Sequence, residues 1–162
     1  MERGSRWAVS ISLGLVAACI ATAFAAAQAP RAAAAENNSL ADKPFADHRL
    51  VLQLSDGDAK KQSLVISVAY NLLKFYGPDK IAIEVVTFGP GIALLRADSP
   101  NRKFVDSLVA QGVRFDLCMN TVDTIKRETG QVPPFNPNAR PVEAGVAQIL
   151  ALTEKGYTLV RP

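Results

Sequence analysis

The side chain best suited to covalent chemistry in this sequence is the thiol of Cys118. It lies in the segment GVRFDLCMNTV, residues 112–122, whose apolar residues recur at every second position up to Leu117, as in a β-strand. Asn120 and Thr121 follow, and both are favoured at the start of a helix. Free amides at a helix start stabilise a thiolate and lower the cysteine pKa. The pattern indicates a reactive thiol, with a buried packing cysteine as the alternative.

The first residues of the chain bear on how this cysteine is used. Arg3 and Arg6 precede an uncharged apolar run over residues 7–27, which is the order of a secretory signal peptide. We expect Sec-type cleavage after residue 27, and export to the periplasm or beyond. Cleavage removes Cys19, so no internal disulfide can form. A lone cysteine in an exported protein suggests intermolecular pairing or a free reactive thiol.

Three alternatives for this N-terminal segment stay open. Cleavage after Ala35 is one. The run is also just long enough to cross a bilayer, although its many alanines make a weak anchor. Finally, residues 16–19 (VAAC) resemble a lipoprotein box in which Cys19 is acylated, but the apolar run continues beyond that cysteine.

The remaining sequence divides into a linker and one domain. Residues 28–46 are alanine-rich and then polar, without an apolar period, and are predicted to be a disordered linker. Residues 47–162 are long enough for one domain with a substantial core. The net charge is +3, and no block of lysine and arginine stands out. The charge therefore gives no case for a nucleic-acid partner, and no membrane contact is expected beyond the signal segment.

Within the domain, β-strand and helix patterns alternate, which indicates βαβ units and a mostly parallel sheet. We predict a three-layer α/β/α domain of four or five strands, flavodoxin-like in general architecture. The expected strands are 49–54, 81–88, 113–118 and 157–161, with a short fifth at 139–142, and the expected helices are 59–76, about 100–111, 121–129 and 143–155. The apolar period places Leu64, Phe104, Val146, Ile149 and Leu150 on inward helix faces.

The turns after parallel strands lie at one edge of the sheet, where such folds bind ligands. This edge is expected to gather Cys118 with six candidate ligand-binding residues: Ser55, Gly57, Gly89, Gly91, Asn120 and Thr121. Glycines let backbone amides approach an anion, which favours a pocket for an oxyanion or a sulfur species. The alternative is that these glycines simply form tight turns.

Other polar residues near this edge favour neither metal nor Cys–His chemistry. No histidine and cysteine cluster has metal-ligand spacing, so no metal and no cofactor is expected. His48 precedes the first strand and should lie at the opposite edge from Cys118. Asp116 could face the same side as Cys118 and oppose its thiolate, with Lys126 and Arg127 as candidate compensating charges.

These features together resemble a known family. A Ser–Asp–Gly turn after the first strand, TFGPG at 87–91, GVRF at 112–115 followed by Cys118, Asn120 and Thr121, and GY at 156–157 are similar to the DsrE/DsrF-like proteins over residues 49–162. The resemblance implies a homo-oligomer, often a trimer or hexamer. It also implies that Cys118 inherits the role of a cysteine that carries sulfur as a persulfide between donor and acceptor proteins.

Two hypotheses follow from these observations. The first is a periplasmic sulfur relay, sulfurtransferase-like, that acts through Cys118. The second is a non-catalytic oligomeric binding or assembly module in which Cys118 is structural. In either case the proline-rich connection 130–141, with Val132 and Phe135, is expected to help build a subunit interface, unless Phe135 folds back onto its own domain.

Overall fold

The computed structural model describes Lys43 and residues 45–162; the expected signal peptide, and the expected linker up to residue 42 together with residue 44, lie outside these residues. The end of the expected linker already contacts the domain. Ala46 is buried, and the Lys43 ammonium donates to three backbone carbonyls, those of Pro78, Ile81 and Gln111. The folded part therefore includes residues before the expected boundary at 47.

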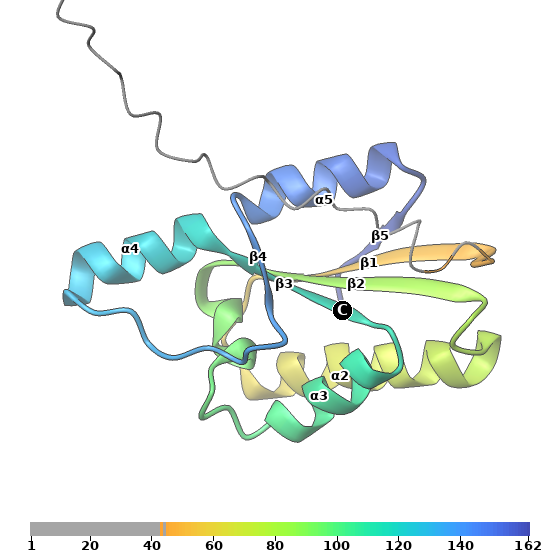
Figure 1. The fold of residues 1–162 in the computed structure, drawn as a ribbon, viewed down its shortest axis with the longest axis horizontal. Coiled ribbons are helices and arrows are strands. Elements are labelled where there is room, and N and C mark those ends of the chain that lie inside the picture. The colour runs from red at the N-terminus through yellow and green to blue at the C-terminus, as the bar shows by residue number, and fades with distance from the viewer. Residues whose placement is uncertain (1–42, 44) are drawn as a thin grey trace, which may run out of the picture. The chain divides into compact units, whose positions relative to one another are not determined.

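Among the described residues, five parallel strands form one sheet in the order β4-β3-β2-β1-β5 (Figure 1). The strands are β1 (His48–Leu54), β2 (Ile81–Thr87), β3 (Arg114–Cys118), β4 (Arg140–Val142) and β5 (Thr158–Val160). The central strand, β2, is mostly apolar and buried along its whole length, because a parallel sheet is covered on both faces. The predicted parallel sheet of four or five strands is confirmed.

Helices cover both faces of the sheet, so the predicted three-layer α/β/α, flavodoxin-like architecture is also confirmed (Figure 1). α2 (Ala59–Tyr76) and α3 (Arg102–Ala110) lie on one face, and α5 (Gly145–Glu154) lies on the other. The right-handed crossover rule explains this arrangement. The chain moves across the sheet in one direction from β1 through β4, and the segment that contains α5 then returns to β5 at the other edge.

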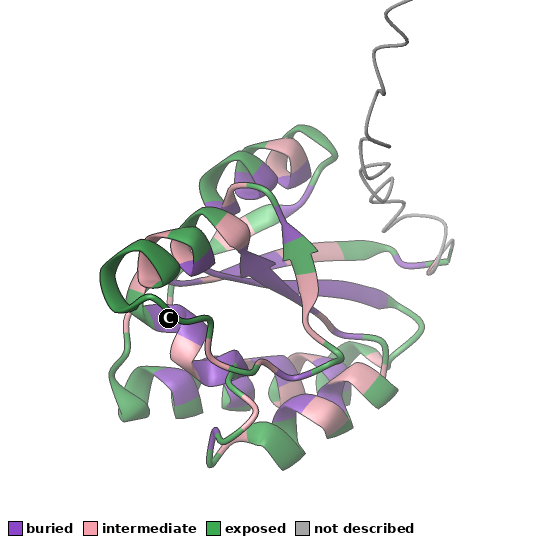
Figure 2. Ribbon diagram, turned by 60° about the vertical axis from the view of Figure 1, so that its left-hand side comes forward, coloured by how far each residue is buried: buried purple, intermediate pink, exposed green. Residues whose placement is uncertain are grey.

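The sheet separates two apolar clusters, and its strands form the buried centre of the molecule (Figure 2). The larger cluster joins the sheet to α2, α3 and a 3₁₀ helix, η1 (Gly89–Leu95), and includes Leu52, Val85 and Phe115. The smaller cluster joins the other face to α5 through Ile149 and Leu152. Burial of these side chains is the main stabilising contribution to the fold.

The inward face predicted for α5 is wrong: the face that is buried in the structure is shifted by about one residue along the helix. Val146 and Leu150 are 64% and 59% exposed, whereas Ile149, Leu152 and Gln148 are buried. The amide of Gln148 donates to the buried Glu84 carboxylate, and this polar contact turns the helix away from the face that hydrophobicity predicts. Leu64 and Phe104, also expected inside, are 46% and 52% exposed.

The proline-rich connection after residue 129 packs partly against its own domain. Phe135 contacts the larger cluster, and its backbone pairs with Arg96 in an isolated antiparallel bridge. The Asn136 N–H also donates to the Leu95 carbonyl, over 2.8 Å. Phe135 therefore takes the alternative position considered above, folded back onto its own subunit, whereas Val132 stays 49% exposed.

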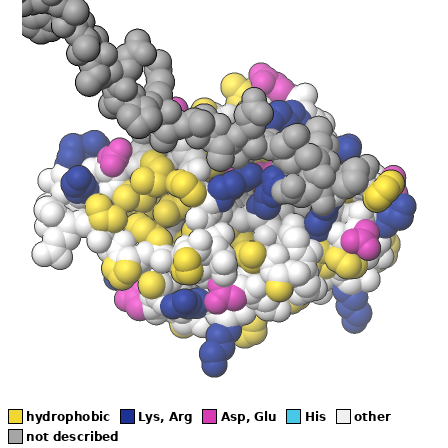
Figure 3. Space-filling view, viewed as in Figure 1, with side chains coloured by type: hydrophobic (Ala, Val, Ile, Leu, Met, Phe, Trp, Pro, Cys, Tyr) yellow, Lys and Arg dark blue, Asp and Glu magenta, His cyan; other side chains and the backbone are white. Residues whose placement is uncertain are grey.

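Exposed apolar side chains are not spread evenly over the surface. On the face shown in Figure 3 they gather at the left, in the region of α4 (Met119–Thr129), and Lys and Arg side chains lie next to them toward the centre. In the part of the chain that the structure describes, no helix is long and apolar enough to span a membrane.

Candidate functional site

Cys118 is the last residue of β3 and occupies the N-cap position of α4, which begins at Met119. The helix thus starts two residues earlier than the expected Thr121, and this places the thiol at the helix start itself. Cys118 is a free cysteine and is 4% exposed. The predicted position, at the seam between a strand and a helix, is confirmed.

The Sγ atom of Cys118 lies where two helices begin. The backbone N–H of Gly145, the first residue of α5, donates to it over 3.2 Å. β3 and β4 are neighbours, with Cys118 paired to Val142. The helix after β3 packs its Val122 into the larger cluster, and the helix after β4 packs into the smaller one. The chain therefore leaves two adjacent strands toward opposite faces, the arrangement at which open α/β sheets bind ligands.

The surroundings of Cys118 lower its pKa on balance. Burial is the largest single influence and raises the pKa, but hydrogen bonds from the Thr121 side chain and from the N–H groups of Gly145, Thr121 and Asn120 lower it, and together they prevail. The Asn120 N–H also donates to the Glu143 carbonyl over 3.1 Å, so it is shared between two acceptors. The net effect favours the nucleophilic thiolate.

Thr121 connects the thiol to the turn that follows β2. The Gly89 N–H donates to Thr121 Oγ1 over 2.9 Å. A threonine hydroxyl carries one proton and accepts through its lone pairs. Because Thr121 accepts from Gly89, its own proton is available to the Cys118 sulfur.

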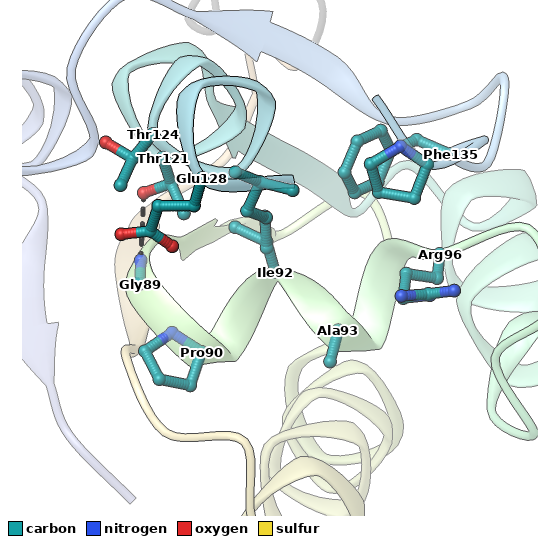
Figure 4. Close-up of a pocket in the computed structure, with 11 residues that line it drawn as sticks. Gly89, Pro90, Ile92, Ala93, Arg96, Thr121, Thr124, Glu128 and Phe135 are labelled. Atoms are coloured by element: carbon teal, nitrogen blue, oxygen red, sulfur yellow. Dashed lines mark hydrogen bonds between the residues drawn. The ribbon is translucent and has the colours of Figure 1, made fainter. Parts of the chain in front are cut away.

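A cavity of about 340 Å³ opens between η1 and α4 (Figure 4). Gly89 and Thr121 line it, so the hydrogen bond between them forms part of its wall. Most other lining side chains are apolar, among them Ile92, Ile125 and Phe135. Its size is at the lower end of the range for small-molecule sites.

The structure divides the six candidate ligand-binding residues into two groups. Gly89, Asn120 and Thr121 lie around Cys118. Gly57 and Gly91 have packing reasons for being glycine: an added Cβ would lie 3.3 Å from Pro90 Cβ in the first case and 2.2 Å from the Leu54 carbonyl oxygen in the second. The Ser55 carbonyl faces the turn at Gly89, 3.5 Å from where a Cβ would stand.

Next to Cys118 along β3 lies a buried charge cluster that the sequence did not reveal. Arg140 of β4 binds Asp116 through Nε over 2.8 Å and also binds Glu84 of β2. Arg140 thus provides the compensating charge that was expected from Lys126 and Arg127. It is 24 residues from Asp116 and 56 from Glu84 along the chain, so only the strand order could have revealed the pairing.

Asp116 is fully buried, and its Oδ2 atom receives no hydrogen bond. Burial raises its pKa to about 7, and the nearby Glu84 carboxylate adds to the rise, against the lowering effect of Arg140. Asp116 is therefore protonated over much of the acidic range in which an ordinary aspartate is charged.

The predicted position of His48 is confirmed. His48, at the start of β1, stacks on Tyr76 with ring centroids 4.2 Å apart, at the opposite edge of the sheet from Cys118. Asp58 caps α2 by accepting from the N–H groups of Lys60 and Lys61. No group of three or more His, Cys, Asp or Glu side chains in the described residues is placed to hold a metal ion.

Comparison with solved structures finds a protein that is similar to this chain over the whole length of that protein. No family model matches the sequence, and no curated protein is similar to it at a significant level. The solved structure of MTH1491 from Methanobacterium thermoautotrophicum is 32% identical, covers 72% of this chain and all of its own, and superposes with a TM-score of 0.64. The chain belongs to the MTH1491 family. MTH1491 is itself a protein of unknown function, so membership of its family assigns the fold and leaves the reaction open.

Proposed function

We propose that this chain is an exported DsrE-like protein that carries sulfur as a persulfide on Cys118. The observation that supports the proposal is the bond from the Gly145 N–H to Sγ, made beside the Thr121 side chain at the junction of two helix starts. A thiolate at such a junction is stabilised by backbone dipoles. A sulfur carrier needs this property twice, since Cys118 is the nucleophile on loading and the leaving group on unloading.

The proposed cycle has two balanced steps. On loading, the Cys118 thiolate attacks the sulfane sulfur of a donor; an Sγ–S bond forms and the donor's S–S bond breaks. A persulfide donor then leaves as a thiolate, and thiosulfate leaves as sulfite. On unloading, the thiolate of an acceptor attacks the outer sulfur of the Cys118 persulfide, and Cys118 leaves again as a thiolate. Donor and acceptor proteins are therefore the proposed partners, and the activity is sulfurtransferase-like.

Intact mass spectrometry tests this proposal. The protein recovered from the cell envelope is exposed to thiosulfate or to an organic persulfide, and the mass is compared with that of Cys118→Ser. A one-sulfur adduct on the parent protein and none on the variant is the expected result. Absence of any adduct with either donor, on a folded protein, rejects the sulfur-carrier function.

One observation favours a second function, a non-catalytic oligomeric binding module. Cys118 is 4% exposed, and buried cysteines often serve only as small apolar residues. Iodoacetamide separates the two functions. A native protein whose Cys118 stays unmodified near neutral pH, yet is modified after denaturation, has a structural cysteine.

The location in the cell is part of the proposal. We propose that export removes residues 1–27, so N-terminal sequencing of protein from the envelope should give a chain that starts near Gln28. A chain that begins at Met1 and stays in membranes identifies an anchor instead. A lipid-modified Cys19 identifies a lipoprotein.

A further inference from the structure

The cavity between η1 and α4 has no role in the sulfur chemistry described so far. η1 contributes Ile92, α4 contributes Ile125, and the returning connection contributes Pro133 and Phe135 (Figure 4). None of these side chains carries a hydrogen-bonding group. A partly open space of about 340 Å³ with a mainly apolar lining favours a hydrocarbon or another polarisable, uncharged group.

The charged residues of the cavity disfavour an anion. The Arg96 guanidinium lies at its rim but is already paired with Asp98, over 3.0 Å. The Glu128 carboxylate also lines the cavity, and Figure 4 shows it beside the hydrogen bond between Gly89 and Thr121. An anion at this end of the cavity would face a like charge without an unpaired cation to offset it.

Thr121 links the cavity to Cys118, which is not itself among the lining residues. Thr121 lines the cavity on one side, and its side chain hydrogen bonds to the sulfur on the other. Cys118 itself is almost fully buried. Thr121 is therefore the residue that the cavity wall and the sulfur share.

We infer that this cavity is the substrate site through which Cys118 is loaded, and that it takes an uncharged sulfane-sulfur compound with a hydrocarbon group, such as the protonated form of an organic hydropersulfide, R–S–S–H. The inference rests on the proposed sulfur-carrier function and names its substrate class. The group R lies among Ile92, Ile125 and Phe135. The Cys118 thiolate attacks the terminal sulfur, which retains its proton as the new Sγ–S bond forms. The S–S bond of the substrate breaks, and R–S⁻ leaves and takes a proton from water.

Three methanethiosulfonate esters test the cavity as the route to Cys118, because they share one leaving group and differ in the transferred group: benzyl, 2-sulfonatoethyl and 2-trimethylammonioethyl. The thiolate displaces methanesulfinate and forms a mixed disulfide in each case. The full chain is reacted and then digested, and the rate of modification at Cys118 is measured from the mass of the peptide that contains it. Any reaction at Cys19 is thereby measured separately. The benzyl ester should react fastest and the anionic sulfonatoethyl ester slowest, by at least about tenfold, relative to their rates with a free thiol.

Two variants and a matched control assign the effect to the cavity. Thr124 lies on the cavity side of α4, and Thr124→Trp should lower the rate at which the benzyl ester reacts with Cys118 by at least about tenfold. Lys126→Trp, on the same helix but exposed and outside the cavity lining, should leave that rate unchanged. Glu128→Gln should speed the reaction of the sulfonatoethyl ester more than that of the benzyl ester, since only the anionic ester is repelled by the carboxylate that the substitution removes.

The outcomes separate this inference from the function on which it rests. If sulfur loads onto Cys118 but neither Thr124→Trp nor Glu128→Gln changes the rates, the carrier function stands and the cavity route is rejected. If the benzyl ester follows the cavity pattern but no donor loads a sulfur, the route stands and the carrier function is rejected. If the rate constants for all three esters fall together as the protein concentration rises, a second copy of the chain covers the cavity, and the proposed substrate site is rejected.

Discussion

The Gly145 N–H and the Cys118 sulfur, 27 residues apart in sequence and 3.2 Å apart in the structure, join the end of β3 to the start of α5. Gly145 has little room for a side chain, since an added Cβ would lie 3.1 Å from Cβ and Cδ1 of Phe88. Phe88 directly follows β2. Packing at Phe88 therefore holds the amide that stabilises the thiolate.

Gly145→Ala should raise the Cys118 pKa and slow its reaction with iodoacetamide near neutral pH, because the added methyl group pushes the amide away from the sulfur. The free energy of unfolding should fall by about 1–3 kcal/mol, the usual cost of an overpacked site. Phe88→Ala in the same chain removes the clash and should restore the thiol pKa, although Phe88→Ala alone is destabilising. A double variant with the thiol pKa of Gly145→Ala would contradict this explanation.

Thr121→Val should also raise the Cys118 pKa, because valine keeps the shape of threonine and removes the hydroxyl. A hydrogen bond to a charged group contributes about 1.5–3 kcal/mol, so its loss disfavours the thiolate. The Cys118 pKa of each protein is measured from the thiolate absorbance as a function of pH, after the absorbance of Cys118→Ser has been subtracted. Thr121→Ser retains the hydroxyl and should behave nearly as the parent, and so should Thr124→Val, whose hydroxyl donates to the Asn120 carbonyl.

The sequence was sufficient to predict the order of the elements, because each depends on local pattern. Alternation up to Leu117 followed by helix-starting residues placed Cys118 correctly at the seam. The run of β2, which is mostly apolar and β-branched, indicated a buried parallel strand, and the structure confirms it. Gly77 ends α2 as predicted, with a positive φ of 88° that suits glycine.

The contacts that surround Cys118 depend instead on which strands are neighbours, and strand order cannot be read from local pattern. The roles of Gly145 and Arg140 follow only once β4 is known to lie beside β3. The rotation of α5 has a similar origin, since the buried Glu84 draws Gln148 inward. A polar partner on another strand thus overrode the apolar period of Val146 and Leu150.

The protein should lose stability as the pH rises from about 4 to about 7, because of Asp116. Its pKa is raised to about 7 in the folded state, and an aspartate in an unfolded chain titrates near 4. Between these values the folded state holds a proton that the unfolded state has released, so the free energy of unfolding falls with pH and levels off above about 7. Urea unfolding at a series of pH values measures the slope.

Asp116→Asn should remove this part of the pH dependence, since asparagine mimics the protonated carboxyl and still accepts from Arg140. Asp106→Asn is the control, because the contribution of Asp106 to stability changes with pH in the opposite direction. Hydrogen bonds from Asn136 and Asn138 lower the Asp106 pKa, so its contribution to stability is lost as the pH falls. An identical slope in the parent and in Asp116→Asn would contradict the proton assignment.

Gly91→Ala should destabilise the fold much more than Gly57→Ala. The Cβ at position 91 would stand 2.2 Å from the Leu54 carbonyl oxygen and 2.7 Å from its carbon, so the end of β1 and η1 must separate. At position 57 the nearest atom is Pro90 Cβ at 3.3 Å, which small shifts can accommodate. Denaturant midpoints should fall by the equivalent of about 3 kcal/mol or more for the first variant and about 1 kcal/mol or less for the second. Similar midpoints would reject close packing as the reason for Gly91.

We propose that the chain forms a homo-oligomer, a trimer or hexamer by resemblance to the DsrE/DsrF-like proteins, and that the connection 130–141 contributes to the interface through Val132. Phe135 is engaged with its own domain, whereas Val132 is 49% exposed on a segment whose prolines restrict it at low entropic cost. Val132→Asp should therefore weaken assembly, measured by light scattering over a range of concentrations, and leave the monomer folded. Phe135→Asp should instead lower the free energy of unfolding by about 2 kcal/mol or more, because it places a charge against the core. If Val132→Asp assembles like the parent protein, the interface lies elsewhere, and the exposed Val146 and Leu150 of α5 become the next positions to substitute.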